Sequence, residues 1–226
     1  MGIRAVKEKV TELLRAADLE KALIELSTYE QGRVLKPLLS SLCSCDKVVK
    51  WHAVTAIGQV VGATAETDFE SARVVMRRFM WMLNDESGGI GWGIPEVIGE
   101  VCAVHPKIAQ EYTHILVSFM REEGFYLELP ELQRGLMWGL GRLAQVYPQL
   151  LVEKNSLSYL PLYLGSADTR VKAGAVYATG LLNDKQSLPV LHKFVGDSSV
   201  VTLYKDRRFE ETTLGALARE AISLLQ

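Results

Sequence analysis

The sequence has few cysteines, almost no charge imbalance and no long apolar run, and each shortage excludes a class of protein. Its 226 residues include 3 cysteines, with 25 basic against 27 acidic side chains. Three thiols cannot all pair, and Cys43-Ser44-Cys45 is spaced too tightly for the usual redox or zinc motif. A chain this close to neutral lacks the cationic tail of many nucleic-acid-binding proteins. We therefore expect reduced thiols and no disulfide framework.

The chain also lacks segments that would direct it to a membrane. No apolar run approaches the roughly 20 residues of a membrane span, and residues 1–9 lack the apolar region of a secretory signal. Apolar residues make up 48% of the chain and charged residues 23%, close to globular averages of about 45–50% and 25%. These values exclude a disordered or fibrous chain, and the length suits one domain or two small ones. The sequence predicts a cytoplasmic globular protein with no membrane partner.

What the chain does contain is an internal repeat. The segment 46–58, DKVVKWHAVTAIG, recurs at 168–180 as DTRVKAGAVYATG. Alignment on the final glycine adds copies that end at Gly99 and Gly141, and a fifth in which Ser223 takes that place. Successive copies lie 39 to 43 residues apart, near the period of about 40–47 residues of HEAT and armadillo solenoids. The repeat predicts a stack of two-helix units.

Five positions in each copy form the apolar face of one helix, which we name the B helix. Their spacing of i, i+4, i+7, i+8 and i+11 follows one side of an α-helix, and Gly139 and Thr179 are the exceptions to their apolar character. We name these positions the core columns. They are Val49, Ile90, Leu132, Val171 and Leu214; Ala53, Ile94, Leu136, Ala175 and Ala218; Ala56, Val97, Gly139, Ala178 and Ala221; Ile57, Ile98, Leu140, Thr179 and Ile222; and Val60, Val101, Leu143, Leu182 and Leu225.

Each B helix needs a partner, which we name the A helix. Three segments place a proline near the start of a short apolar helix, where first-turn N–H groups lack acceptors in any case. These segments are 35–42, 160–164 and 188–194. Further helices are expected at 3–16 and 19–29, as N-terminal caps, and at 68–83 and 107–121, as A helices. Asp46 and Asp168 are candidate N-caps of two B helices.

Residues 199–213 break the helical pattern. The segment alternates and contains β-branched residues, so it is expected to form a β-hairpin with Lys205 to Arg207 near its turn. It lacks the Asn-Gly or Asp-Gly pair typical of a tight hairpin. A loop with a frayed helix is the alternative.

The signature D-x-x-V-K-x-x-A-x-x-A-I-G at 46–58 and its copy at 168–180 resemble the HEAT-repeat class, especially the phycobilisome-lyase type. The stretch 81–96 is similar to one in a small bacterial HEAT-repeat family of unassigned function. The resemblance implies an all-α fold, a right-handed α-α superhelix, with the hairpin as a small C-terminal insertion. It implies one domain over 1–226, with capping helices at 1–30 and repeats at about 31–64, 65–105, 106–148, 149–183 and 184–226. No catalytic residue is carried over from it.

The opposite side of the B helices carries aromatic and charged residues. Positions 51, 55 and 59 and their equivalents point away from the core columns at about 100° per residue, and we name them together the 51/55/59 face. Its columns are Trp51, Trp92, Arg134, Ala173 and Ala216; Thr55, Glu96, Trp138, Tyr177 and Glu220; and Gln59, Glu100, Arg142, Leu181 and Leu224. Three of the 4 tryptophans fall on this face, and tryptophan beside arginine is typical of binding hot spots.

We expect this face to be solvated, on the concave wall of the solenoid, and to bind another protein or a peptide. The candidate partner-binding residues are Trp51, Trp92, Glu96, Glu100, Arg134, Trp138, Arg142 and Tyr177. The two glutamates are expected to pair with the two arginines of the next repeat, whose guanidinium planes could stack on Trp92 or Trp138. The alternative is that the tryptophans seal gaps between adjacent helices and the ion pairs lie at the rim.

No catalytic, metal or cofactor site is expected. The histidines have no metal-ligand spacing, and a cluster of Cys43, Cys45 and His52 is a weak candidate. The glycine-rich stretch 87–93 could expose the amides of Gly88 to Gly93 to an anion, but close helix approach explains those glycines better. We therefore expect a non-catalytic scaffold or adaptor without a cofactor.

Two other functions are kept as alternatives. HEAT-like alkylpurine DNA glycosylases use a tryptophan-lined concave face, but here two arginines stand against three glutamates and the pI is about 6.1. Phosphate binding needs a basic footprint, so a nucleic-acid partner is not expected. The second alternative is a lyase or chaperone-like subunit acting on a cofactor-bearing protein, by analogy with the namesake of the repeat alone.

Overall fold

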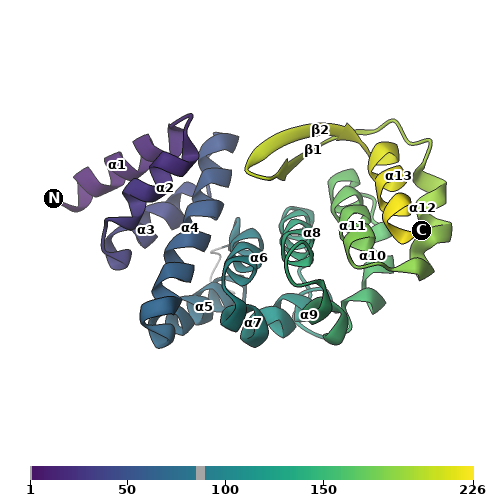
Figure 1. The fold of residues 1–226 in the computed structure, drawn as a ribbon, viewed down its shortest axis with the longest axis horizontal. Helices are drawn as coiled ribbons and strands as arrows, with labels where there is room; N and C mark the ends of the chain where they lie inside the picture. Colours follow the sequence, from purple (N-terminus) through teal and green to yellow (C-terminus); the bar gives the residue numbers. More distant parts are fainter. Residues whose placement is uncertain (1, 85–89) are drawn as a thin grey trace. The chain divides into compact units, whose positions relative to one another are not determined.

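The computed structural model describes residues 2–84 and 90–226 (Figure 1). The chain divides into two compact units, Met1–Ile108 and Ala109–Gln226, with the boundary inside helix α7 (Pro106–Ser118). We describe each unit by itself. The single continuous domain expected from the repeat stays a prediction.

The regular secondary structure in the described residues of unit 1 is α-helical. Its helices are α1 (Ile3–Arg15), α2 (Leu19–Ser27), α3 (Gln31–Ser41), α4 (Lys47–Thr67), α5 (Phe69–Asn84) and α6 (Ile94–Val104). Helices α4 and α6 are the B helices and pack against each other, with α3 and α5 as A helices against α4 (Figure 1). Helices α1 and α2 also pack on α4, as expected of N-terminal caps.

Unit 2 contains the remaining helices and the sheet. After α7 come α8 (Pro130–Ala144), α9 (Pro148–Glu153), η1 (Ser156–Ser158), α10 (Leu160–Leu164), α11 (Thr169–Leu181), η2 (Lys185–Ser187), α12 (Leu188–Phe194), β1 (Val200–Lys205), β2 (Arg208–Thr213) and α13 (Leu214–Leu225). The B helices α8, α11 and α13 lie side by side in that order. Helices α9, α10 and α12 pack behind them as A helices.

The core columns form the core of both units, which confirms the predicted register. The whole second column is fully buried, from Ala53 to Ala218, and the third and fourth columns are buried as well. Ile90 is an exception at 45% exposed, because it lies before the first residue of α6. Val60 is half-buried. The helical spacing of apolar residues therefore determined which face of each B helix is covered.

The glycine that ends each repeat signature permits close approach of the next B helix. A Cβ on Gly58 of α4 would lie 2.5 Å from Glu100 Cγ of α6. A Cβ on Gly180 of α11 would lie 2.9 Å from the backbone Cα of Ala221 in α13. Since real Cβ atoms do not approach neighbours this closely, the repeated glycine is required by helix packing.

The helices begin where the predicted N-caps and first-turn prolines place them, with one exception. The Asp46 carboxylate accepts from the amides of Val48 and Val49, and Asp168 caps α11 in the same way. Proline lies in the first turn of α10 and α12 as expected. Pro37 is different, because α3 begins at Gln31 and places this proline inside the helix. The first turn of α3 is polar, so the apolar pattern did not mark it. The helix was therefore predicted to begin at residue 35, which is too late.

The predicted β-hairpin is confirmed. Strands β1 and β2 are antiparallel, and the register runs from Val200 opposite Thr213 to Lys205 opposite Arg208. The turn residues Asp206 and Arg207 have φ values of 49° and 62°, so both adopt the left-handed conformation. Two such residues match the right-handed twist of the strands in a two-residue hairpin.

Candidate binding face

The 51/55/59 face is less solvated than the sequence predicted. Trp92 is 37% exposed, and Trp51, Trp138, Tyr177 and the two candidate arginines are half-buried. Thr55, Glu96 and Glu100 are buried, at 2–4% exposed, so the expectation of solvent there was wrong.

The column position of Trp92 implied that this residue lies on a helix, but it lies outside one. Helix α6 begins at Ile94, and Gly93 before it has a φ of 77°, which interrupts helical geometry. Trp92 therefore lies in the turn that leads into α6. The neighbouring residues 87–89 of the glycine-rich stretch lie outside the described residues, so its anion-binding role stays untested.

In unit 1, a buried carboxylate joins α4 to α6. Lys50 Nζ lies 2.9 Å from Glu96 Oε1, and the Glu96 side chain is 4% exposed. Glu96 Oε2 is buried and has no hydrogen-bond partner among the described residues. The same ammonium lies 5.7 Å from the centroid of the Trp51 ring. An aromatic ring and a half-satisfied acid therefore lie together around one lysine.

Arg134 connects two B helices of unit 2. Its Nε lies 3.1 and 3.0 Å from the two carboxylate oxygens of Asp168, and its Nη2 also donates to Asp168. Glu131 lies 3.6 Å away on the same helix. Because Asp168 also caps α11, this pair fixes α8 to the first turn of α11. The guanidinium holds the pKa of the Asp168 carboxyl below its usual value.

The glutamate–arginine ladder expected along this face is not tested. Glu96 and Glu100 belong to unit 1, whereas Arg134 and Arg142 belong to unit 2. Within their own units, Glu96 pairs with Lys50 and Arg134 pairs with Asp168. The ladder between the units stays a prediction, as does stacking of the guanidinium groups on Trp92 or Trp138.

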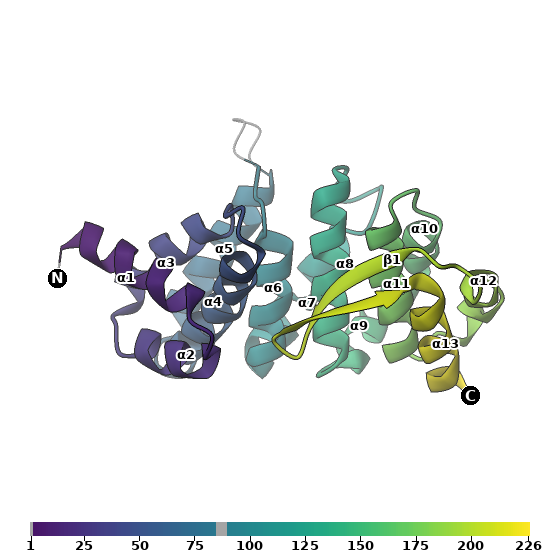
Figure 2. The same ribbon diagram turned by 90° about the horizontal axis from the view of Figure 1, so that it is seen from above.

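In unit 2, the chain's own β-hairpin lies on the 51/55/59 face (Figures 1 and 2). Trp138 Nε1 of α8 donates to the main-chain oxygen of Tyr204 in β1, at 2.6 Å. The two rings are also in contact, with centroids 6.4 Å apart, within the range of favourable aromatic pairs. Tyr204 contacts Phe209 across the hairpin at 5.2 Å. One indole thus binds both the backbone and the side chain of an extended strand.

The next residue of β1 contacts the two following B helices. Lys205 Nζ lies 5.4 Å from the centroid of the Tyr177 ring in α11 and 3.6 Å from Glu220 Oε1 in α13. Gln145 Nε2 donates to the Tyr177 hydroxyl at 2.8 Å. Burial raises the pKa of the Tyr177 phenol, and the Lys205 ammonium offsets part of that rise. A neutral ring and a carboxylate therefore hold the cation.

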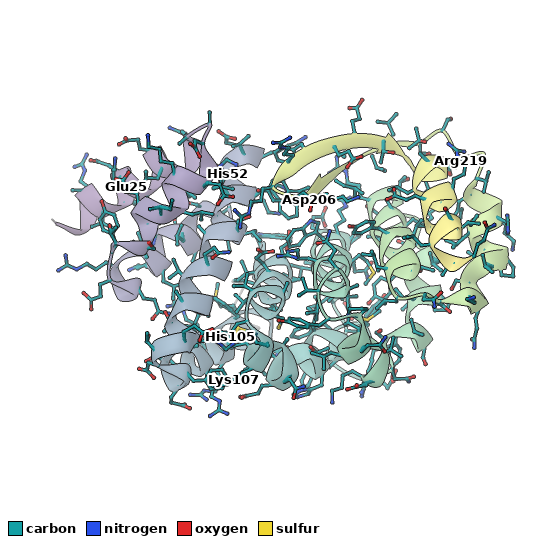
Figure 3. The ribbon with its side chains drawn as sticks, in the orientation of Figure 1. Glu25, His52, His105, Lys107, Asp206 and Arg219 are labelled. Carbon is teal, nitrogen blue, oxygen red and sulfur yellow. The ribbon has the colours of Figure 1, made fainter. Side chains whose placement is uncertain are left out.

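These contacts belong to a single column. Trp138, Tyr177 and Glu220 occupy the same repeat position, equivalent to residue 55, in three successive B helices. Sequence reasoning placed all three on one face but did not place β1 against them. Alternation in β1 gave no signal for a single covered side, because its two buried residues, Val201 and Tyr204, lie three positions apart and so point to opposite faces of the strand. Figure 3 labels Asp206 at the turn that follows.

The cysteines and histidines of the described residues do not form a metal site. Within 2–84 and 90–226, no three His, Cys, Asp or Glu side chains are grouped to hold a metal ion. Cys43 and Cys45 are exposed, whereas His52 is buried and its Nδ1 lies 2.8 Å from Leu14 O (Figure 3). Burial raises the pKa of the Cys102 thiol to about 12, so this thiol stays protonated and unreactive at neutral pH.

None of the helices within residues 2–84 and 90–226 is both long and apolar enough to cross a bilayer.

Comparison with known proteins supports the fold more strongly than any function. No family model matches the chain. An uncharacterised protein of Archaeoglobus fulgidus is 26% identical over 192 residues, which cover 82% of this chain and 95% of that protein. A designed armadillo repeat protein in complex with peptide (KR)4 superposes with a TM-score of 0.52 at 18% identity, covering 98% of this chain and 99% of its own.

A computationally designed armadillo repeat protein for modular peptide recognition gives a TM-score of 0.54, at 18% identity and with 98% and 100% of the two chains covered. The chain is therefore an all-α repeat solenoid of armadillo type with a small two-stranded sheet. The finer assignment to the HEAT class of phycobilisome lyases, or to a bacterial HEAT-repeat family, stays a prediction.

Proposed function

We propose that the protein is a non-catalytic scaffold that binds an extended peptide segment of another protein on its 51/55/59 face. The observation that carries the proposal is the position of β1 on this face in unit 2. The strand is an extended segment, and it is bound by side chains from three successive B helices, Trp138, Tyr177 and Glu220.

The contacts divide recognition into two parts. The indole N–H of Trp138 binds a main-chain oxygen, which every peptide offers regardless of sequence. Tyr177 and Glu220 bind the ammonium of Lys205, which selects a cationic side chain. Backbone hydrogen bonds for affinity and side-chain contacts for specificity are the general mode of recognition of extended peptides.

Unit 1 offers a related set of groups. Trp51 and Trp92 supply aromatic surface, and Glu96 supplies a buried carboxylate. A buried acceptor without a hydrogen-bond partner is costly, so Glu96 Oε2 favours a donor from outside the described residues. A lysine or arginine of a bound peptide has such a donor. We include Glu100, Arg134 and Arg142 in the proposed face because they lie in the same columns.

The fold comparison supports this proposal. One structural neighbour is described as a complex with peptide (KR)4 and another as designed for modular peptide recognition. Both are similar to this chain in fold alone. The cytoplasmic location stays a prediction, and the nucleic-acid and lyase alternatives have no residue assigned to them.

The test compares peptide binding by two variants, each of which replaces one tryptophan by alanine. An array of synthetic octapeptides, with alternating Lys-Arg, Tyr-Lys or Asp-Glu sequences, is titrated against the full chain by fluorescence polarisation. We expect the two cationic series to bind and Trp92→Ala to weaken the Lys-Arg series about tenfold, as is typical of an interface aromatic.

The matched control is Trp81→Ala. Trp81 is 67% exposed but lies on the A helix α5, away from the 51/55/59 face. Circular dichroism confirms that both variants are folded. Failure of every peptide to bind, or equal losses from Trp92→Ala and Trp81→Ala, would contradict the proposed function.

A further inference from the structure

We infer that the hairpin 200–213 occupies, within its own chain, a binding site for an extended segment that carries an aromatic residue followed by lysine. A partner with that dipeptide binds the same column by displacing the tip of the hairpin. This inference rests on the proposed function and specifies its ligand and its competitor.

The contacts of the hairpin show what the site selects. The Tyr204 main-chain oxygen accepts from Trp138, and the Tyr204 ring packs on the indole. Lys205 then reaches Tyr177 and Glu220. Two successive residues are therefore bound by three B helices. Arginine after the aromatic residue would also neutralise the Glu220 carboxylate. The contact of one ammonium group with the face of a ring is nevertheless the geometry of lysine, as Lys205 shows.

The hairpin is fixed at its base and held at its tip by this column. At the base, the amide of Leu214 donates to Ser199 O at 3.0 Å, and that of Gly215 donates to Asp197 O at 2.9 Å. Near the tip, Tyr204 and Lys205 contact the B helices. Strand β2 is exposed over most of its length. The tip can therefore leave the column while the base keeps the hairpin attached to α13.

The electrostatics favour a cation in this position. Burial lowers the pKa of Lys205, but Tyr177 and the nearby carboxylates of Glu220, Glu210 and Asp206 more than offset that effect. When the hairpin tip leaves, Glu220 and Tyr177 lose their contact with the Lys205 ammonium. A lysine supplied by a partner restores both interactions, which is why we assign the partner a cationic segment rather than an acidic or purely apolar one.

The experiment uses the chain's own segment as the probe. A labelled synthetic peptide of residues 199–213, which contains both strands, is titrated against the full chain by fluorescence polarisation. The test variant is Lys205→Glu, which places a carboxylate beside Glu220 and weakens the internal competitor. We expect it to bind the peptide at least tenfold more tightly than the unaltered chain.

Three controls identify the contacts responsible. Glu211→Lys reverses an exposed charge on β2 that lies opposite Thr202 rather than Lys205, and it should leave peptide binding unchanged. A peptide in which Lys205 is replaced by Glu should not bind the Lys205→Glu chain. Adding Trp138→Phe to that chain, which removes the indole donor, should cancel the gain in affinity. Equal binding by the unaltered and Lys205→Glu chains, or equal binding of both peptides, would overturn the inference.

A second measurement covers the case in which Lys205→Glu fails to fold. Excess peptide is added to the unaltered chain, and hydrogen exchange is followed in β1 and β2. Loss of protection in these strands, without loss in α11, supports displacement, and unchanged protection rules it out. A dimer with exchanged hairpins, detected by light scattering, would also contradict a monomeric competitor. If cationic octapeptides still bind through Trp92, only this inference fails and the proposed function stands.

Discussion

The two units use the same helical repeat but cover the 51/55/59 face differently. In unit 1, α4 and α6 are joined by the Lys50–Glu96 ion pair beside Trp51. In unit 2, α8, α11 and α13 hold a β-hairpin through Trp138 and Lys205. The core columns are buried in both units, apart from Ile90 and Val60 of unit 1. Core packing therefore fixes how the B helices stack, and leaves each unit free to cover the other face with different chemistry.

The largest expected effect tests the charge pair of unit 1. In Lys50→Met the buried Glu96 carboxylate loses its cation, and breaking a buried pair by removing one partner costs about 3–5 kcal/mol. Because the Lys50 side chain is 30% exposed, we expect the low end, about 3 kcal/mol. Urea unfolding measures the loss, and hydrogen exchange should locate it in α4 and α6.

Two controls separate the lost pair from a general effect of removing a lysine. Lys47→Met removes an exposed lysine from the start of the same helix and should change stability by less than about 0.5 kcal/mol. The double variant Lys50→Met with Glu96→Leu replaces the pair by apolar groups and should recover most of the loss. A Lys50→Met chain as stable as Lys47→Met would show that charge does not hold this part of unit 1 together.

Most of the fold followed from the sequence, because apolar spacing and repeat period report directly on packing. The signature glycines, the aspartate caps and the hairpin were all found in this way. The site was only partly predictable. The repeat position of Glu96 placed it outside the core columns but did not predict its burial, and its partner Lys50 lies 46 residues earlier. Trp138 and Tyr204 are 66 residues apart, and no periodicity relates a helix face to a strand that folds back over it.

The second prediction concerns pH in unit 2. The Arg134 guanidinium, through its hydrogen bonds, holds the pKa of the Asp168 carboxyl below its usual value of 3.8. A carboxyl whose pKa is lowered in the folded state stabilises the protein above pH 3.8. This stability is lost as the pH falls through the pKa of the carboxyl in the folded state. We expect Arg134→Met to lose about 1–2 kcal/mol at pH 7.

The difference between Arg134→Met and the unaltered chain should shrink as pH falls below 3.8, because protonated Asp168 no longer needs the arginine. Unfolding titrations at pH 7, 4 and 3 measure it. Arg170→Met is the control, since Arg170 is exposed and gives only its backbone amide to Asp168. A difference that stays constant over this pH range would mean that Arg134 acts through packing of its side chain rather than through the ion pair.

The smallest effect tests whether the hairpin is held in the way that distinguishes unit 2. Trp138→Phe keeps an aromatic ring against Tyr204 but removes the N–H that binds the Tyr204 main-chain oxygen. One such hydrogen bond contributes about 1 kcal/mol. We expect hydrogen exchange in β1 and β2 to accelerate about fivefold, and exchange in α4 and α6 of unit 1 to stay unchanged. Trp81→Phe, on the exposed surface of α5, is the matched control. Equal acceleration in both units would show that Trp138 supports the fold as a whole. The difference between unit 1, where an ion pair joins the B helices, and unit 2, where a hairpin covers them, would then no longer hold.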